Sequence, residues 1–291
     1  MNPEKNKALR DMLNAPGLIV APGCHDCITA RLIEDVGFKV AYAGGNGMMG
    51  SLLGVPDIGI GTMTDMATRV HQISSCIDIP LICDADAGYG NINNVWCAVR
   101  EFEAAGASGI HIEDQTMPKK CGAMAGVSVE PIEVMVEKIK VALAARRDKN
   151  FVIIARTDSG VIYGTDEVIR RLKAFGEAGA DVLMPVCVPS KEDNIRIMKE
   201  LQGYNVLADM CEFGEKVIYS DAEVAEMGFK IVTHPLSSAF YMSKVMRAFY
   251  EEYYRTGTTL GLYKDMNSRE AWENTVGMQD WLSLRSRVLG D

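Results

Sequence analysis

A repeated pattern of short apolar runs and amphipathic stretches constrains the fold of this chain more than any other feature of its sequence. The runs do not alternate polar with apolar residues, as a strand with one wet face would. We therefore expect parallel strands that are buried on both faces. The expected strands are residues 17–21, 40–43, 81–84, 109–113, 151–156, 182–185, 206–209 and 231–234.

Helical segments lie between these runs, for example at residues 94–105, 134–145, 166–178 and 191–201. Eight strand–helix units in sequence predict an α/β fold of the (β/α)8 TIM-barrel type. An open doubly wound sheet would instead require a Gly-rich phosphate loop after the first strand, and PGCHDC is not one. Barrels of this size are commonly one domain, so we expect residues 1–291 to form a single unit.

A helical tail follows the eighth expected strand, at about residues 237–291. Its expected helices, 237–254 and 268–287, carry many aromatic side chains. Aromatic surface of this extent beyond a closed barrel predicts that the tail packs on a neighbouring subunit.

Composition excludes several classes of partner. The formal net charge of −9 argues against a nucleic-acid or anionic-membrane surface. No apolar run reaches the ~18–20 residues that a membrane span needs. The polar first residues do not resemble a signal peptide, so we expect a cytoplasmic protein whose eight cysteines are thiols.

Carboxylates end two neighbouring strands of the expected barrel. Asp84 and Asp86 follow the third strand, and Glu113 ends the fourth. In such barrels the chemistry lies at the C-terminal ends of the strands, where like charges repel unless a cation joins them. Oxygen ligands suit a hard ion, so these residues predict a site for Mg²⁺ or Mn²⁺, against the alternative of solvated carboxylates.

Two further features have alternative interpretations. Arg156 ends an apolar strand, where it could pair with a neighbouring carboxylate or bind a carboxylate of the substrate. Cys121 follows two lysines in a Gly-containing loop, where its thiol could be a tuned acid or base on a closing loop. The alternative for Cys121 is an idle thiol in a surface loop.

Several motifs together resemble one known family. They are Tyr42-Ala-Gly-Gly45, Pro56-Asp57, Asp84-Ala-Asp-Ala-Gly-Tyr-Gly90, Ile112-Glu-Asp-Gln115, Lys119-Lys-Cys-Gly122, Ala155-Arg-Thr-Asp158, Glu212-Phe-Gly214 and Pro235-Leu-Ser237. With these motifs in this order, the chain resembles the isocitrate lyase/phosphoenolpyruvate mutase superfamily. The resemblance extends from Gly17 to about Arg269. It looks most like the short methylisocitrate and 2,3-dimethylmalate lyases.

The resemblance implies a barrel whose last helix is exchanged between subunits, usually in a homotetramer built as a dimer of dimers. It implies Mg²⁺ near Asp84, Asp86 and Glu113, with Asp57 further out. It makes Cys121 the proton donor on a mobile gating loop, with Arg156 and Glu212 as the other catalytic residues. The remaining substrate-binding residues it implies are Tyr42, Gly44, Gly45, Asn46, Gly122, Asp209, Cys211 and Arg269.

Departures from the family pattern bear on the substrate, a small carboxylate. Ala123 stands where the lyases usually have His, and Val186 where they usually have Glu. Asp209 and Cys211 replace Asn and Thr, and Phe240 aligns with an Arg of the methylisocitrate lyases. Fewer cationic and amide groups predict a 2-hydroxy diacid of the 2,3-dimethylmalate kind rather than a tricarboxylate such as 2-methylisocitrate.

The predicted reaction is Mg²⁺-dependent cleavage of a carbon–carbon bond to give a 2-oxo acid, such as pyruvate, and a second carboxylic acid. The alternatives are an oxaloacetate hydrolase or decarboxylase, a phosphonomutase of the same superfamily, and a barrel that retains no activity and serves as a scaffold.

Overall fold

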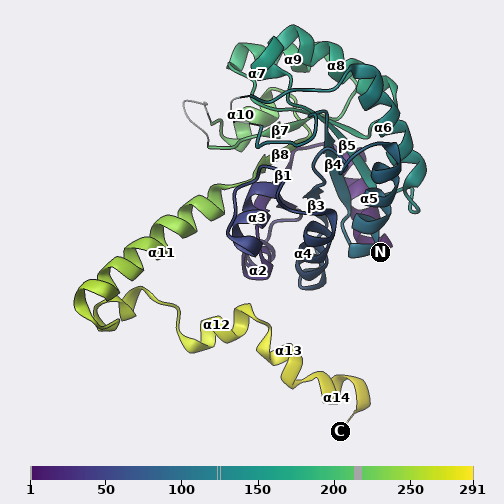
Figure 1. Cartoon of the computed structure of the whole chain (residues 1–291). Helices are drawn as coiled ribbons and strands as arrows, with labels where there is room; N and C mark the ends of the chain where they lie inside the picture. The colour runs from purple at the N-terminus through teal and green to yellow at the C-terminus, as the bar shows by residue number, and fades with distance from the viewer. Residues whose placement is uncertain (1, 123, 125, 213–217, 291) are drawn as a thin grey trace.

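Eight parallel strands form the centre of the molecule (Figure 1). The computed structural model describes residues 2–122, 124, 126–212 and 218–290. The strands pair in the order β6-β5-β4-β3-β2-β1-β8-β7, and a bridge between Leu183 and Val206 joins β6 to β7, so the sheet is a nearly closed barrel. Their bounds are β1 Ile19–Cys24, β2 Ala41–Ala43, β3 Leu81–Asp84, β4 Gly109–Glu113, β5 Val152–Thr157, β6 Val182–Pro185, β7 Leu207–Asp209 and β8 Ile231–His234.

Helices surround this barrel in alternation with the strands, which confirms the predicted (β/α)8 class. α1 (Pro3–Asn14) precedes β1, and the short α3 (Gly45–Leu53) and α7 (Gly160–Tyr163) stand in the loops after β2 and β5. The remaining helices around the barrel are α2 Cys27–Val36, α4 Met63–Ser75, α5 Ile92–Ala105, α6 Ile132–Ala145, α8 Thr165–Glu177, α9 Lys191–Glu200 and α10 Asp221–Glu226.

The strands are buried on both faces, as their uninterrupted apolar sequences predict. One set of side chains, including Leu81, Ile110 and Ile153, packs under the helices. The alternate set, including Ile82, Ile154 and Met184, forms a second cluster. The bounds of β1 differ from expectation. It begins two residues later than predicted, and it continues to Cys24 because it pairs with β2 at Gly23 and Cys24.

The C-terminal tail leaves the barrel as the long helix α11 (Ser237–Thr256). All 20 residues of α11 are described, and none of them is buried. The 3₁₀ helix η1 (Leu260–Asp265) follows, and α12 (Arg269–Thr275) returns to contact α2. The prediction of a single helix over 268–287 is wrong. Gly277 takes a left-handed φ of 71° and separates α12 from α13 (Met278–Leu282). A further helix, α14 (Leu284–Leu289), follows α13.

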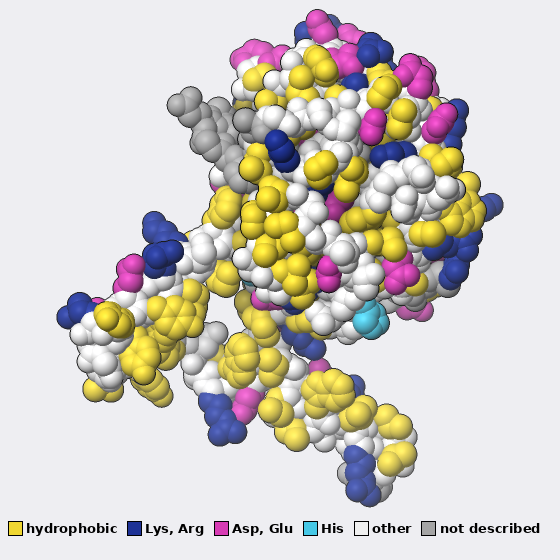
Figure 2. Space-filling view, in the orientation of Figure 1, with side chains coloured by type: hydrophobic (Ala, Val, Ile, Leu, Met, Phe, Trp, Pro, Cys, Tyr) yellow, Lys and Arg dark blue, Asp and Glu magenta, His cyan; other side chains and the backbone are white. Residues whose placement is uncertain are grey.

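Hydrophobic side chains gather along this tail (Figure 2). Tyr254 is 93% exposed, and Trp281 is 69% exposed. Among the described helices, α11 included, we find none that is long and apolar enough to cross a membrane.

Candidate active site

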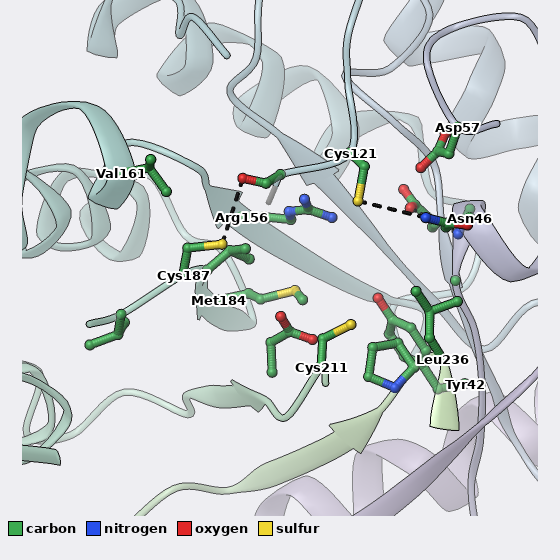
Figure 3. A pocket seen from close by; sticks show the side chains of 18 of the residues that line it. Tyr42, Asn46, Asp57, Cys121, Arg156, Val161, Met184, Cys187, Cys211 and Leu236 are labelled. Carbon is green, nitrogen blue, oxygen red and sulfur yellow. Dashed lines mark hydrogen bonds between the residues drawn. The ribbon is translucent and has the colours of Figure 1, made fainter. Parts of the chain in front are cut away.

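A cavity of about 490 Å³ opens at the C-terminal ends of the barrel strands (Figure 3). Every strand except β1 and β4 supplies or immediately precedes residues that line it, and the loop after β4 supplies Cys121 and Gly122, as the barrel architecture predicts for a catalytic site. Its polar lining residues are Tyr42, Asn46, Asp57, Asp84, Cys121, Arg156, Cys187, Asp209 and Cys211, with the backbones of Gly44, Gly45 and Gly122. Its apolar lining residues are Val161, Met184, Val186, Val188, Pro189, Pro235 and Leu236.

The end of β3 positions two buried carboxylates, Asp84 and Asp86, of which Asp84 lines this cavity. Asp84 Oδ2 accepts a hydrogen bond from the backbone N–H of Gly45 at 3.0 Å, and its Oδ1 accepts one from the N–H of Asp86 at 2.8 Å. A β-carbon at position 45 would lie 2.7 Å from Asp84 Oδ2, so only glycine allows this approach. Asp86 itself has a φ of 49°, and the chain turns sharply at that residue.

A lysine that the sequence analysis assigned to the Cys121 loop is buried between these acids. Lys119 is 2% exposed, and its Nζ lies 2.6 Å from Asp57 Oδ1 and 2.5 Å from Asp86 Oδ1. Burial alone would lower the pKa of this ammonium, but Asp84, Asp86 and Glu113 outweigh that effect and raise the pKa well above its usual value. Lys119 is therefore charged, and its charge is directed at carboxylates of the predicted metal site.

The residues present fit a hard divalent cation. Asp57, Asp84, Asp86 and Glu113 are all buried, and Asp57 and Asp84 line the cavity. Neither carboxylate oxygen of Glu113 has a hydrogen-bond partner among the described residues, and burial raises the pKa of Glu113 well above its ordinary value. Within the described part of the chain no three ligand side chains already converge as a coordination site, which agrees with Lys119 lying between two of them.

Arg156 pairs with neighbouring carboxylates, which was the first of its two interpretations, and its place in the cavity lining leaves the second one open. Its Nη2 lies 3.0 Å from Asp158 Oδ1 and 3.2 Å from Glu113 Oε2. Burial opposes its charge, but Asp158, Glu113 and Asp84 raise the pKa of the guanidinium well above its normal range. It also lines the cavity, where it is the one cationic side chain among the described lining residues. Arg156 can therefore bind an anionic ligand from the cavity while it remains paired with Asp158.

A tyrosine–histidine pair lies beside the carboxylates. The hydroxyl of Tyr42 is 2.5 Å from His111 Nε2, and His111 Nδ1 is 3.6 Å from Asp84 Oδ1. Burial raises the pKa of Tyr42 well above its usual value and lowers that of His111 to about 4. Both groups are therefore neutral near pH 7, and Tyr42 presents a polar atom to the cavity.

The segment that leads up to and carries Cys121, residues 116–122, is described throughout, and we call it the Cys121 loop. Gln115, at its base, forms an antiparallel bridge with Val129. The backbone N–H of Cys121 donates to the carbonyl of Asp57 at 3.0 Å, and its Sγ lies 3.7 Å from Asn46 Nδ2 (Figure 3). These contacts place the thiol in the cavity lining, between the acidic end and Arg156.

The structure brings together most of the residues predicted for the site, but not all of them. Glu212 is exposed, accepts a hydrogen bond from Ser237 and is absent from the described lining of the cavity. Arg269 is 90% exposed on α12, where it pairs with Glu273 at 2.6 Å. Within this chain these two residues are therefore not brought to the cavity. Phe240, on α11, is likewise not among its described lining residues, and Ala123 lies outside the described residues.

Sequence reasoning missed three features of this site. The ammonium of Lys119 was expected near Cys121, but it binds Asp57 and Asp86 instead. The pairing of Tyr42 with His111 joins two strands that are not adjacent, so no local pattern reports it. The apolar side of the cavity was anticipated only at Val186, because the loops that complete it have no periodic pattern.

Comparison with known proteins decides the family. The family described as "Phosphoenolpyruvate phosphomutase" matches residues 9–253 of this chain. The chain belongs to the phosphoenolpyruvate mutase/isocitrate lyase superfamily. It is therefore an enzyme, and the relatives that are named as lyases confirm the predicted enzyme class.

The relatives have closely similar sequences and structures. The 2,3-dimethylmalate lyase of Eubacterium barkeri is 38% identical over 93% of each chain. A 2-methylisocitrate lyase of Aeropyrum pernix is 34% identical over 94% of this chain and 87% of its own. The structure of an oxaloacetate acetylhydrolase with 3,3-difluorooxalacetate superimposes with a TM-score of 0.93 at 30% identity, over 99% and 98% of the two chains. The structure of a phosphonopyruvate hydrolase with oxalate and Mg²⁺ superimposes with a TM-score of 0.87 at 29% identity, over 98% of this chain and 99% of that one.

Proposed function

We propose that this protein is a Mg²⁺-dependent lyase that cleaves the C2–C3 bond of a 2-hydroxy diacid with small apolar substituents. The products are a 2-oxo acid and a second carboxylic acid. The observation that carries the proposal is the composition of the cavity lining, which combines one cation, Arg156, with the carboxylates of Asp57, Asp84 and Asp209, the thiol of Cys121 and a set of apolar side chains that includes Met184, Val186 and Leu236. The 2,3-dimethylmalate lyase of Eubacterium barkeri, which matches most of the chain, supports it.

The acidic end of the cavity would hold the metal. Asp84, Asp86 and Glu113 would be its nearest residues, with Asp57 further out. A bound magnesium ion would supply Lewis-acid polarisation of the oxygen on C2. A structural relative, the phosphonopyruvate hydrolase, is known with oxalate and Mg²⁺, which supports this assignment. Mn²⁺ suits the same oxygen ligands.

Residues of the chain itself perform the remaining tasks. Arg156 binds the carboxylate at C1 beside the backbone of Gly44 and Gly45, where the N–H of Gly45 already donates to Asp84. When the C2–C3 bond breaks, its electron pair stays on C3 and the hydroxyl proton must leave, for which Asp209, at the end of β7, is the acceptor. The carbanion at C3 is protonated by the thiol of Cys121. Protonation forms the C–H bond of the second acid and leaves a thiolate on Cys121. The thiolate must recover a proton before the next cycle.

The apolar residues of the lining determine which diacids fit. Side chains such as Met184, Val186 and Leu236 favour alkyl groups, each buried methyl or methylene contributing roughly 0.8 kcal/mol. A third carboxylate would find no additional cation among the described lining residues. We therefore assign a substrate of the 2,3-dimethylmalate type rather than 2-methylisocitrate.

A panel of acids tests this assignment. Purified enzyme is incubated with Mg²⁺ and, in turn, 2,3-dimethylmalate, 2-methylisocitrate, oxaloacetate and phosphonopyruvate, and the products are identified by NMR. Each alternative releases a different product, so formation of oxalate and acetate would establish a hydrolase instead. The same assay in EDTA should show no turnover, and added Mg²⁺ should restore it. Full turnover of the metal-free enzyme would refute the metal assignment.

We also propose that the protein is a homo-oligomer, in which the tail of one subunit packs on another as a dimer of dimers. Tyr241, Tyr254 and Trp281 are each more than two-thirds exposed in the single chain. Light scattering at micromolar concentration tests this, and a mass near that of one 31.8 kDa chain would refute it.

A further inference from the structure

Gln115, at the C-terminal end of β4, is a buried side chain to which the proposed reaction assigns no role. It is 1% exposed. Its Oε1 accepts a hydrogen bond from the backbone N–H of Lys120 at 2.9 Å, and its Nε2 donates to the carbonyl of Lys120 at 2.9 Å. One side chain thus satisfies both backbone groups of the residue that precedes Cys121, and it fixes the position of that part of the Cys121 loop.

The same amide also reaches the carboxylate behind Arg156. Gln115 Nε2 donates to Asp158 Oδ2 at 2.9 Å. The other oxygen, Asp158 Oδ1, accepts from Arg156 Nε at 3.2 Å and from Nη2 at 3.0 Å. A continuous set of hydrogen bonds therefore runs from the guanidinium that faces the cavity, through Asp158 and Gln115, to the backbone of the Cys121 loop.

A second, independent contact joins the loop to the same ion pair. A β-carbon at Gly122 would lie 2.6 Å from Asp158 Oδ1 and 2.8 Å from Arg156 Nη2. Real side chains essentially never approach this closely, so the loop backbone rests directly on the Arg156–Asp158 pair. Glycine at position 122 is required for this arrangement.

We propose that Gln115 is a positioning residue that holds the Cys121 loop closed on the Arg156–Asp158 ion pair, so that the thiol faces a carboxylate bound by Arg156. The inference rests on the proposed function only in taking Cys121 as the proton donor. Without the amide, Asp158 and the backbone of Lys120 would lose these hydrogen bonds. Opening of the loop would then let water solvate them. Binding of the ligand by Arg156 would persist, because Asp158 Oδ1 would still hold the guanidinium.

The test measures access to the Cys121 thiol separately from ligand binding. Gln115→Met removes every polar atom of the side chain at similar length. Gln72→Met, on the exposed face of α4, is the matched control. The rate of alkylation of Cys121 by iodoacetamide is followed by peptide mass spectrometry, with and without oxalate plus Mg²⁺. Recording it as a pH profile separates a change in thiol ionisation from a change in access. Calorimetry measures oxalate affinity for each protein.

We expect oxalate to protect Cys121 in the wild type and in Gln72→Met. In Gln115→Met, alkylation in the presence of oxalate should be at least about 10-fold faster, since two hydrogen bonds to the loop are lost. Its oxalate affinity should change by less than about 3-fold. A residue with only a structural role would weaken oxalate binding as well. Equal protection of Cys121 in Gln115→Met and the wild type would overturn the proposal, as would a parallel loss of oxalate affinity.

Gly122→Ala keeps the proposal testable if Gln115→Met does not fold. Its added methyl group disturbs the same contact from the side of the loop, so it should also expose Cys121, and full protection in this variant would contradict the inference. The alkylation assay does not depend on turnover. If none of the acids is cleaved but protection depends on Gln115, the proposed reaction fails and this inference stands. If a diacid is cleaved but Gln115→Met leaves the protection of Cys121 unchanged, the proposed reaction stands and this inference fails.

Discussion

Removing the ammonium of Lys119 should destabilise the protein by about 3–5 kcal/mol when no divalent cation is available. That is the usual cost of breaking a buried ion pair by removing one partner. Lys119 is 2% exposed and lies within 2.6 Å of two carboxylates, Asp57 and Asp86, which themselves are nearly inaccessible. Lys119→Met retains most of the buried apolar stem, so the effect reports the lost charge. For a chain of this length it corresponds to a fall in Tm of roughly 5–10 °C.

Magnesium should partly reverse this loss, because a divalent cation can neutralise the same carboxylates. We expect Mg²⁺ to raise the Tm of Lys119→Met by more than it raises that of the wild type, in which the ammonium already neutralises Asp57 and Asp86. The free energy of unfolding is measured by urea titration and Tm by calorimetry, each in EDTA and in Mg²⁺.

The matched control is Lys7→Met, which breaks an exposed pair with Asp11 whose side chains are 67% and 60% accessible. Such surface pairs contribute about 0–1 kcal/mol, and this variant should not respond to Mg²⁺ differently from the wild type. If Lys119→Met were as stable as Lys7→Met in EDTA, the carboxylates around Lys119 would not need a cation. The argument for a metal at this end of the cavity would then lose its electrostatic basis.

Three further predictions concern the chemistry, the substrate and the pH dependence of stability. Cys121→Ser should lower kcat by at least ~10²-fold, the usual scale for the loss of a general acid, whereas Cys97→Ser, at an exposed thiol, should leave it unchanged; equal rates would move the proton donor elsewhere. The kcat/KM for 2,3-dimethylmalate should exceed that for 2-methylisocitrate by about 10- to 100-fold, since a buried carboxylate without a cation costs several kcal/mol; a preference for the tricarboxylate would show that another cation reaches the cavity. Burial lowers the pKa of His25, so the unfolded chain binds its proton at a higher pH than the folded chain does, and the stability that His25 contributes falls as the pH drops below about 6.5. His25→Gln should therefore lose less stability than the wild type between pH 7.5 and about 5.5 in urea titrations, and an equal loss in both proteins would show that His25 is not the group responsible.

Much of the fold follows from patterns that are local in the sequence. Each buried parallel strand is an apolar run of its own, and β3, β4, β6 and β8 begin and end at the predicted residues. The acidic residues of the site could also be located, because a barrel places the ends of its strands at one mouth. Residues such as Asp84 and Glu113 thus come together as a direct consequence of the fold class.

Contacts made by loops could not be located in this way. Gln115 belongs to a motif that the sequence shows plainly, yet its bonds to Asp158 and Lys120 depend on how the Cys121 loop folds back over the barrel. The same is true of Lys119, whose local sequence places it beside a thiol and whose tertiary contacts are two carboxylates. Arg269 was predicted from alignment with a family position, and within a single chain it is exposed on α12, which lies outside the barrel.

The charges around the cavity connect the metal requirement with the choice of substrate. Arg156 is already paired with Asp158 and lies beside Glu113, and Lys119 is paired with Asp57 and Asp86. An incoming dianion therefore meets no excess of positive charge from the described residues that surround the acidic end, and Asp84 and Asp209 add negative charge to the lining. A divalent cation supplies the charge that one carboxylate and the oxygen on C2 require. Each further carboxylate would need a cation of its own, and the remaining described lining residues are mostly apolar, among them Met184, Val186 and Leu236. The same charges therefore support both parts of the proposal, the bound metal and the preference for a diacid over a tricarboxylate.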